Sequence, residues 1–227
     1  MSITKDFLPK HPEVCVYQDD EMFRMNTDTM VLGEFLEVYR HDTILDIGTN
    51  QGVLLLYASF FGPQKMIGID INERALDLAQ RNMIANNIQE VEFHQVDAAT
   101  YCKDPVDVIV CNPPYFQTKD DEKGKNPYLN LAKHEGELTL SKLIHSIDVN
   151  LKPNGKVYFL YQTSRLHEVM DEFLLHHMQI KVLKFIYDVR KEISNVVLIK
   201  AIKGGLPGLV VQKPIIITRT SSKVVSS

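Results

Sequence analysis

Three aspartates stand at or just after the ends of short hydrophobic runs, where a side chain can reach a ligand. Asp46, Asp70 and Asp97 follow this pattern in TILDI, KMIGIDI and VEFHQV. A carboxylate at the first position attracts a cationic group and repels a pyrophosphate, whereas one at the second matches both hydroxyls of a ribose. The third is placed to accept from an amino group such as that of adenine. Each acid alone is equally consistent with a helix cap or a solvated loop, but three in succession predict a ligand site.

A glycine turn follows the first of these runs. The segment 46–52 reads DIGTNQG and leads into the apolar stretch VLLLYASFF. Glycines between a strand and a helix let backbone N–H groups approach a ligand closely. The spacing differs from the dinucleotide pattern G-x-G-x-x-G, so the turn by itself is weak evidence for any one ligand.

The most specific motif is Asn112-Pro113-Pro114-Tyr115, directly after the run DVIVC. The two prolines restrict the backbone and remove two N–H donors, which leaves acceptors on display. The Asn112 side-chain oxygen and the Pro113 carbonyl are then placed to accept both hydrogens of one planar NH₂ group. Tyr115 offers a face for stacking a flat ring. We therefore predict a clamp for a ring amine, with a rigid turn at the end of a strand as the alternative interpretation.

The elements that must position these residues alternate along the chain. Hydrophobic runs that alternate with helical patterns are typical of a parallel sheet covered on both faces. The last two runs are joined by only five residues, too few for a crossover helix, so we expect them to be antiparallel. The sequence thus predicts an α/β fold, a doubly wound, seven-stranded, mostly parallel sheet with an antiparallel last strand. The predicted strands are 43–47, 65–71, 91–96, 107–111, 156–162, 180–189 and 195–202, and the predicted helices are 27–39, 52–61, 73–86, 139–151 and 164–177.

The chain is identified by these motifs as a member of the class I S-adenosylmethionine-dependent methyltransferases, which have a Rossmann-like fold. DIGTNQG, IDIN, QVDA and NPPY stand in the order and spacing of that family, and NPPY is similar to its amino-methylating branch. The resemblance implies S-adenosylmethionine as the cofactor and Asn112, Pro113, Pro114 and Tyr115 as catalytic residues. It also implies a cofactor site made of Asp46, Gly48, Asn50, Gly52, Asp70, Ile71, Asp97, Ala98 and Asn112.

The flanking segments resemble one subfamily more closely. FRMNTDTMVLGEFL (23–36), KHEGELTL (133–140) and residues 190–211 are similar to bacterial tRNA adenine-N6 methyltransferases, which modify the adenosine next to the anticodon of a valine tRNA. This likeness implies a tRNA substrate. The residues expected to contact the tRNA are Thr27, Asp28, Arg190, Lys191 and Lys203.

Other functions stay open at this point. The clamp also suits guanine N2 in rRNA, adenine in DNA or glutamine in a release factor, and a non-catalytic RNA-interaction protein that binds the cofactor is a further alternative. The sequence also departs from the family pattern, because Asn50 stands where a glycine is usual. Asparagine tolerates the left-handed backbone region, so we expect the turn to survive, with cofactor binding weakened or reshaped at worst.

The distribution of charge along the chain indicates a nucleic-acid partner, although the net charge of the whole chain does not. The chain of 227 residues has a net charge of −4, but residues 1–180 hold 16 basic and 27 acidic residues, whereas residues 181–227 hold nine and two. A basic C-terminal segment predicts contacts with tRNA phosphates. No protein partner is indicated.

Composition limits the remaining classes. The three cysteines show no C-x-x-C spacing, and the longest apolar run is too short to span a bilayer. We expect a cytoplasmic protein with no membrane span and no metal site. The predicted organisation is a single domain over 1–217, divided into an N-terminal extension with one helix (1–40), a cofactor-binding core (41–163) and a C-terminal helix and hairpin (164–217), followed by a flexible tail (218–227).

Overall fold

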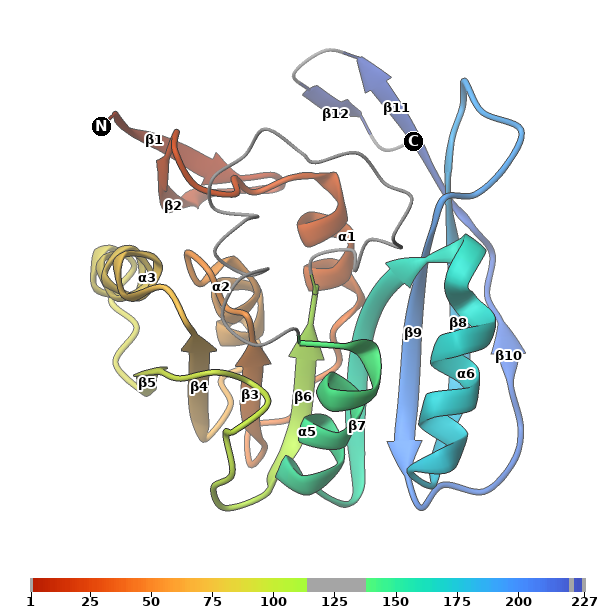
Figure 1. Ribbon diagram of the computed structural model, residues 1–227. Helices are drawn as coiled ribbons and strands as arrows, with labels where there is room; N and C mark the ends of the chain where they lie inside the picture. Colours follow the sequence, from red (N-terminus) through yellow and green to blue (C-terminus); the bar gives the residue numbers. More distant parts are fainter. Residues whose placement is uncertain (1, 114–137, 221–222, 226–227) are drawn as a thin grey trace.

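A twisted sheet forms the centre of the protein. The computed structural model describes residues 2–113, 138–220 and 223–225 (Figure 1). Seven strands match the predicted ones and stand in the order β8-β9-β7-β6-β3-β4-β5. They are β3 (Thr43–Ile47), β4 (Lys65–Asp70), β5 (Val91–Gln95), β6 (Val106–Cys111), β7 (Leu151–Gln162), β8 (Met178–Asp188) and β9 (Val196–Lys203).

The direction of each strand decides which residues share an edge. Strand β3 pairs in parallel with β4 and β6, and β6 pairs in parallel with β7. Strand β9 runs antiparallel to both β7 and β8, as the short connection predicted. The carboxyl ends of β3 to β8 therefore meet at one edge of the sheet, whereas β9 ends at the opposite edge.

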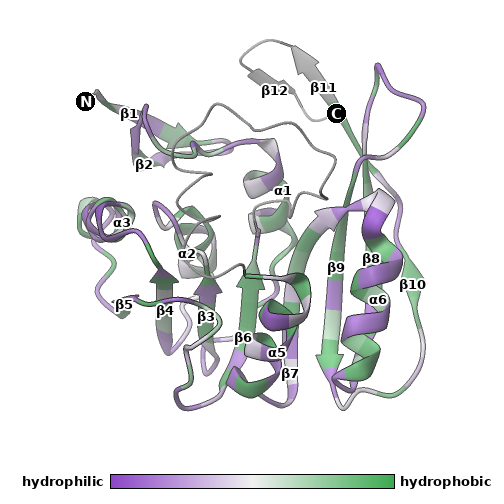
Figure 2. Cartoon of the chain, viewed as in Figure 1, coloured by the Kyte–Doolittle hydropathy of each residue, from purple (hydrophilic) through white to green (hydrophobic). Residues whose placement is uncertain are grey.

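Helices cover both faces, as expected for a parallel sheet. One hydrophobic cluster joins α1 (Thr27–Phe35), α2 (Val53–Ser59) and α3 (Glu73–Ala85) to residues such as Ile44 and Val108, and the other joins α5 (Leu140–Asn150) and α6 (Leu166–Leu175) to their neighbours Leu45 and Ile109. Figure 2 shows hydrophobic residues along most of β6 and alternating colours on α6, which has one buried side. A short 3₁₀ helix, η1 (Thr163–Arg165), precedes α6.

The N-terminal region differs from the expectation of an irregular start followed by one helix. Strands β1 (Ile3–Leu8) and β2 (His11–Asp19) form an antiparallel hairpin before α1. Charged side chains and Pro12 obscure the alternation of these strands in the sequence. Helix α1 is shorter than the predicted 27–39. Its N-cap is Asn26, whose side chain accepts from the Thr29 amide.

The C-terminal region extends the sheet beyond the seven predicted strands. Strand β11 (Ile215–Thr220) pairs in parallel with β8, β10 (Val210–Val211) also pairs with β8, and β12 (Lys223–Val225) pairs with β11. The segment 218–227, expected as a flexible tail, thus contains strand residues. Its serines suggest fraying, but the preceding run Ile215–Thr220 continues the pairing at the β8 edge. Within the described ranges, no helix is long and apolar enough to span a membrane.

Candidate active site

Asp46 is a buried carboxylate near the end of β3, with no exposed surface. Its Oδ2 accepts a hydrogen bond from the Thr49 hydroxyl at 2.7 Å, whereas its Oδ1 has no hydrogen-bond partner among the described residues. Burial raises the pKa of Asp46 from 3.8 to about 7; the Thr49 hydroxyl lowers it, and the charge of Asp70 raises it further. A buried acid with an open acceptor atom suits a ligand that brings a positive charge.

The glycine turn is fixed to the neighbouring strand β4. The backbone N–H groups of Gly48 and Thr49 both donate to the Ile69 carbonyl at 2.9 Å. Gly48 has φ +72° and open space where a Cβ would stand, whereas at Gly52, with φ +77°, a Cβ would lie 3.0 Å from the Met83 side chain. Gly52 thus serves close packing on α3, and Gly48 leaves room beside Asp46.

Asn50 retains the turn despite replacing the expected glycine. Its φ of 48° lies in the left-handed region, which asparagine tolerates. Its backbone N–H donates to the Asp70 carboxylate at 2.9 Å, and its side-chain amide donates to the Phe23 carbonyl at 2.7 Å. The substitution therefore adds a contact with the N-terminal segment.

Asp70 closes the next strand, β4, as predicted. Its other carboxylate oxygen accepts from the Asn72 amide at 3.0 Å, and burial raises its pKa although backbone hydrogen bonds, including those from Asn72 and Asn50, oppose the shift. Ile71 beside it is 36% exposed, which presents an apolar surface next to the acid. An acid flanked by an exposed apolar side chain suits a ribose with an attached flat ring.

Asp97 and Ala98 follow β5, the next strand in the sheet. Asp97 is half-buried and accepts from the Ala99 amide at 2.8 Å, and Ala98 is buried, with its carbonyl accepting from the Ser146 hydroxyl at 2.6 Å. Because β3, β4 and β5 are neighbours, the three acids predicted from strand ends lie along one edge, in chain order.

Asn112 lies on the other side of β3, at the end of β6. Its side-chain amide donates to the Thr29 hydroxyl at 3.3 Å, and Pro113 after it is buried. The Cys111 thiol donates to the Ile47 carbonyl at 3.3 Å and ties the ends of β6 and β3 together. The structure thus brings Asn112 next to the acid-lined edge. Pro114 and Tyr115 lie outside the described residues.

Helix α1 supplies Thr29, a residue that the sequence reasoning missed. Thr29 and Asp28 are buried and Thr27 is half-buried. Identifying Asn26 as the cap would have placed Thr29 in the first turn, but only the packing of α1 beside β6 shows that its hydroxyl meets Asn112. Of the expected substrate residues here, Asp28 is 9% exposed and lines a small recess with Lys191.

The basic residues of the C-terminal segment do not form one surface. Arg190 follows β8 at the same edge as the acids, but its guanidinium donates to both carboxylate oxygens of Asp188, at 3.1 and 3.0 Å. Lys203 ends the reversed strand β9 at the opposite edge, where its ammonium contacts the Asp148 carboxylate at 2.8 Å and the carbonyls of Asp148 and Leu151. The structure therefore brings Arg190 and Lys191 to the same edge of the sheet as the acids, at β8, and leaves Lys203 at the opposite edge.

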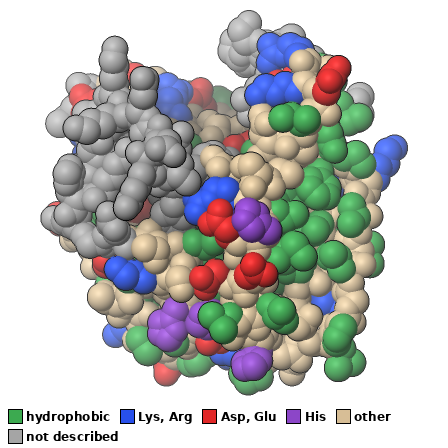
Figure 3. Space-filling model, turned by 45° about the vertical axis from the view of Figure 1, so that its right-hand side comes forward, with side chains coloured by type: hydrophobic (Ala, Val, Ile, Leu, Met, Phe, Trp, Pro, Cys, Tyr) green, Lys and Arg blue, Asp and Glu red, His purple; other side chains and the backbone are tan. Residues whose placement is uncertain are grey.

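The surface near this segment is largely hydrophobic. Figure 3 shows hydrophobic side chains over much of the right-hand part of that face. Exposed apolar residues of α6 and the segment after β9 include Leu174, Leu175, Leu206, Val210 and Val211. The excess of basic residues in 181–227 is thus not a single patch.

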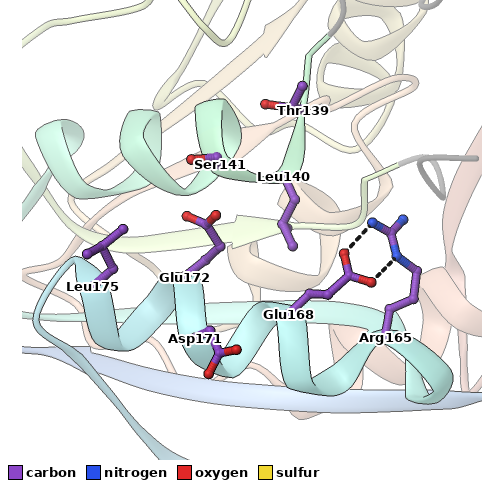
Figure 4. A pocket seen from close by; sticks show the side chains of 8 residues that line it. All are labelled: Thr139, Leu140, Ser141, Arg165, Glu168, Asp171, Glu172 and Leu175. Carbon is purple, nitrogen blue, oxygen red and sulfur yellow. Dashed lines mark hydrogen bonds and ion pairs between the residues drawn. The ribbon is translucent and has the colours of Figure 1, made fainter. Parts of the chain in front are cut away.

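A cavity in the described part of the chain lies away from the acid-lined edge. It measures about 600 Å³ and lies between α6 and the start of α5 (Figure 4). Its lining holds Glu168, Asp171 and Glu172 against one cation, Arg165, which is bound to Glu168 at 2.8 and 2.5 Å. An excess of acids disfavours phosphate binding, so we do not place a nucleic acid there.

Comparison with known proteins gives a methyltransferase family for most of the chain. A family model described as "Methyltransferase small domain" matches residues 15–186, which is more than half of the chain. The ribosomal protein L11 methylase from Lactobacillus delbrueckii subsp. bulgaricus has a similar solved structure, with a TM-score of 0.60 and 18% identity over 82% of this chain and 84% of that one. At that identity the likeness shows the fold alone.

Two curated relatives carry different substrate names. A candidate protein N5-glutamine methyltransferase from Methanocaldococcus jannaschii is 33% identical over 67% of this chain and 74% of its own length. A tRNA1(Val) (adenine(37)-N6)-methyltransferase from Pseudoalteromonas translucida is 32% identical over 53% of this chain. The chain spans about half of the length of that second relative (52%), and 63% of the corresponding enzyme of Aeromonas hydrophila.

Proposed function

The chain belongs to the methyltransferase small domain family, and we propose that it methylates the exocyclic N6 amine of an adenosine in tRNA. The nucleotide proposed is the one next to the anticodon of a valine tRNA. The observation that carries the proposal is the orientation of Asn112, whose amide nitrogen is held by Thr29.

S-adenosylmethionine is the cofactor, and the residues at the edge of the sheet fit it. The Oδ1 of Asp46 has no hydrogen-bond partner among the described residues, and a Cβ at Gly48 would meet nothing within 4 Å. We call the space beside these two residues the cofactor cradle. Asp70 and Ile71 suit its ribose and adenine, and Asp97 suits the adenine amino group. When bound, the cofactor supplies a methyl group made electrophilic by a positively charged sulfur.

Asn112 is oriented by the hydrogen bonds of its neighbour. The Thr29 hydroxyl donates its one hydrogen to the Asn26 side chain at 3.1 Å, so towards Asn112 it acts as an acceptor. The Asn112 NH₂ group therefore faces Thr29, and its Oδ1 is left to accept from a substrate. This is the polarity that a clamp for an amine requires.

The clamp would make the amine nitrogen a better nucleophile. The lone pair of an aromatic amine is delocalised into the ring, which makes the nitrogen a poor nucleophile. Acceptance of both N–H hydrogens at Asn112 Oδ1 and the Pro113 carbonyl favours a pyramidal nitrogen with a free lone pair. Positioning in line with the methyl group can contribute about 7–11 kcal/mol. No strong base is needed, because the nitrogen becomes acidic once it carries the methyl group and then loses one proton to water.

Three arguments favour adenosine in tRNA as the substrate. Several relatives at about 30% identity are named for this reaction. The segment 23–36, which resembles that subfamily, contains the Thr29 that orients Asn112. An anticodon-loop base is also unstacked at little cost, which gives the clamp access to the amine.

Glutamine is the second candidate substrate, favoured by the M. jannaschii relative. A glutamine side-chain amide is also a planar NH₂ group, and the acceptors at Asn112 and Pro113 suit it equally. The two substrates therefore differ in what binds beside the clamp rather than in the clamp itself.

The deciding experiment is the transfer of tritiated methyl groups from S-adenosylmethionine to unmodified bulk tRNA and, separately, to a release-factor preparation. We expect label in tRNA, recovered as N6-methyladenosine after nucleoside digestion. Label in N2-methylguanosine or in glutamine would identify the other substrates, and no label in any acceptor would contradict the catalytic proposal.

Asn112→Ala tests the clamp in the same assay. We expect the rate of methyl transfer to fall by about 100-fold or more, the scale seen when one oriented hydrogen-bonding group is removed from an active site. Calorimetric binding of S-adenosylhomocysteine to the variant confirms that the cofactor site is still folded. A rate within a few-fold of the parent protein would rule out the clamp role.

A further inference from the structure

The segment 23–29 connects the cofactor turn to Asn112. At its first residue, the Phe23 carbonyl accepts two hydrogen bonds from the turn, from the side-chain amides of Asn50 at 2.7 Å and Gln51 at 3.2 Å. At its last residue, the Thr29 hydroxyl accepts from the Asn112 amide at 3.3 Å. Seven consecutive residues thus contact both halves of the site.

The segment is held internally and from outside. Asn26 caps α1 by accepting from both the amide and the hydroxyl of Thr29, at 2.9 and 3.1 Å. The Met25 amide donates to the Gln18 side chain of β2 at 2.7 Å. The segment is therefore bonded to the hairpin at Met25 and to its own helix cap at Thr29.

The other side of the turn is anchored to the same hairpin. Asn82 of α3, which has no exposed surface, donates to the Gln51 carbonyl at 2.9 Å and to the Tyr17 carbonyl of β2 at 3.1 Å, and accepts from the Tyr17 amide at 2.7 Å. The cofactor turn, α3 and the hairpin thus meet at one buried asparagine.

Asn50 keeps the backbone conformation of a glycine at this position and adds a side-chain hydrogen bond that a glycine cannot make. It adopts the left-handed backbone that the turn requires, and its side chain donates the shorter of the two hydrogen bonds to Phe23. A glycine would preserve the turn and remove that bond. The backbone N–H of Asn50 also donates to Asp70, so one residue contacts the ribose-binding acid and the N-terminal segment together.

We infer that Asn50 is a positioning residue, which holds the segment 23–29 against the cofactor turn and so sets the spacing between the methyl donor and the Asn112 clamp. The donor end of this inference rests on the family's cofactor, and only the clamp end rests on the proposed function. The segment couples the two because both of its ends are bonded to the site.

The donor end is tested with Asn50→Gly and S-adenosylhomocysteine, with no methyl acceptor present. We expect its affinity, measured by calorimetry, to fall about 3- to 10-fold, the scale of one lost hydrogen bond. Hydrogen exchange over residues 20–26 should become faster, including at the Met22 and Met25 amides. Asn87→Gly is the matched control, since Asn87 is also left-handed, with φ 58°, and lies at the end of α3.

The inference is overturned if Asn50→Gly binds S-adenosylhomocysteine within twofold of the parent protein with unchanged exchange over 20–26. It is also overturned if Asn87→Gly produces the same changes, because the effect would then come from backbone freedom alone. Neither readout needs a substrate, so both stand whether or not tRNA is methylated.

The clamp end is tested with Thr29→Val and Thr29→Ser. The valine variant removes the hydroxyl and should leave S-adenosylhomocysteine affinity unchanged while methyl transfer slows by about tenfold. The serine variant keeps the hydroxyl and should restore most of the rate. Equal rates of methyl transfer for the valine and serine variants would contradict the role of this hydrogen bond. The absence of methyl transfer to tRNA by the parent protein would instead count against the proposed function.

Discussion

Two buried carboxylates occupy equivalent places at the same edge of the sheet and have opposite surroundings. Asp46 near the end of β3 has no exposed surface, and its Oδ1 has no hydrogen-bond partner among the described residues. Asp188 at the end of β8 is 8% exposed and is bound on both oxygens by the Arg190 guanidinium. The first is left ready for a cation from outside the chain, whereas the second has its cation within it.

This difference supports the proposal that Asp46 binds a ligand, whereas Asp188 has a structural ion pair. Both residues are acids at strand ends, and position alone does not distinguish them. What distinguishes them is the second oxygen of each carboxylate. An isolated buried acid destabilises the protein when it is ionised, which is tolerated where a ligand later compensates its charge. The charge of a paired acid is already compensated within the chain, so removing one partner of the pair is unfavourable.

The largest expected effect is on the unfolding free energy at pH 8, which should rise in Asp46→Asn and fall in Asp188→Asn. The native pKa of Asp46, about 7, is above its ordinary 3.8, so between these values the native state holds a proton that the unfolded chain has lost. Its contribution to stability therefore falls as the pH rises from about 4 to 7 and stays unfavourable above. Asp46→Asn should raise the unfolding free energy at pH 8 by about 1–4 kcal/mol, with no gain near pH 4.

Asp188→Asn should instead lower the unfolding free energy at pH 8, because the charge-assisted hydrogen bonds from Arg190 are weakened, and solvent around the exposed guanidinium keeps that loss small. Urea unfolding of both variants at pH 4 and pH 8 makes the measurement. Changes of the same sign in the two variants at pH 8 would remove the distinction between the acids.

A second pair of variants compares glycines from the two regions. Gly48 in the cofactor turn and Gly204 after β9 have φ of +72° and +69°, and a Cβ would meet nothing within 4 Å at either. Alanine should therefore cost each about 1–2 kcal/mol of stability through backbone strain. Only Gly48→Ala should also weaken S-adenosylhomocysteine binding, by about tenfold or more, since its new methyl group enters the cofactor cradle. Equal affinities in both variants would place the cofactor elsewhere.

The smallest expected effects concern two lysines of the basic segment. Lys203→Met should lower the unfolding free energy by about 1–2 kcal/mol, since Lys203 bonds to Asp148 and Leu151, and should leave tRNA binding unchanged. Lys191→Met should leave stability unchanged and reduce the salt slope of tRNA binding by roughly 0.7–0.9. A salt slope altered by Lys203 rather than Lys191 would contradict the placement of tRNA at the carboxyl edge.

The sequence was sufficient for the core of the fold and for the placement of three acids at one edge of its sheet. Alternating hydrophobic runs and helices predict β3 to β9, and strand ends predict the positions of Asp46, Asp70 and Asp97. The hairpin β1–β2 was missed because charged residues and Pro12 interrupt its pattern. Strands β10 to β12 were missed because β10 and β11 depend on pairing with β8, and β12 depends on pairing with β11.

The acceptor half depended on contacts between distant residues. The role proposed for Thr29 rests on its hydrogen bond with Asn112, and the role proposed for Asn50 rests on its hydrogen bond with Phe23. The charge count treated Arg190 as free, although Asp188 two residues earlier neutralises it. Lys203 was misplaced because β9 is reversed, so a residue at its end lies at the opposite edge from the site.

The central claim is that ionised Asp46 binds the positively charged methyl donor, S-adenosylmethionine. The pH dependence of S-adenosylmethionine binding tests this claim most directly. If the bound cofactor requires ionised Asp46, affinity in the parent protein should rise by close to tenfold per pH unit between pH 5.5 and 7 and then level off near the pKa of about 7. Asp46→Asn should bind more weakly at pH 7.5 and show little of this rise. The same pH dependence in the parent protein and in Asp46→Asn would contradict the claim.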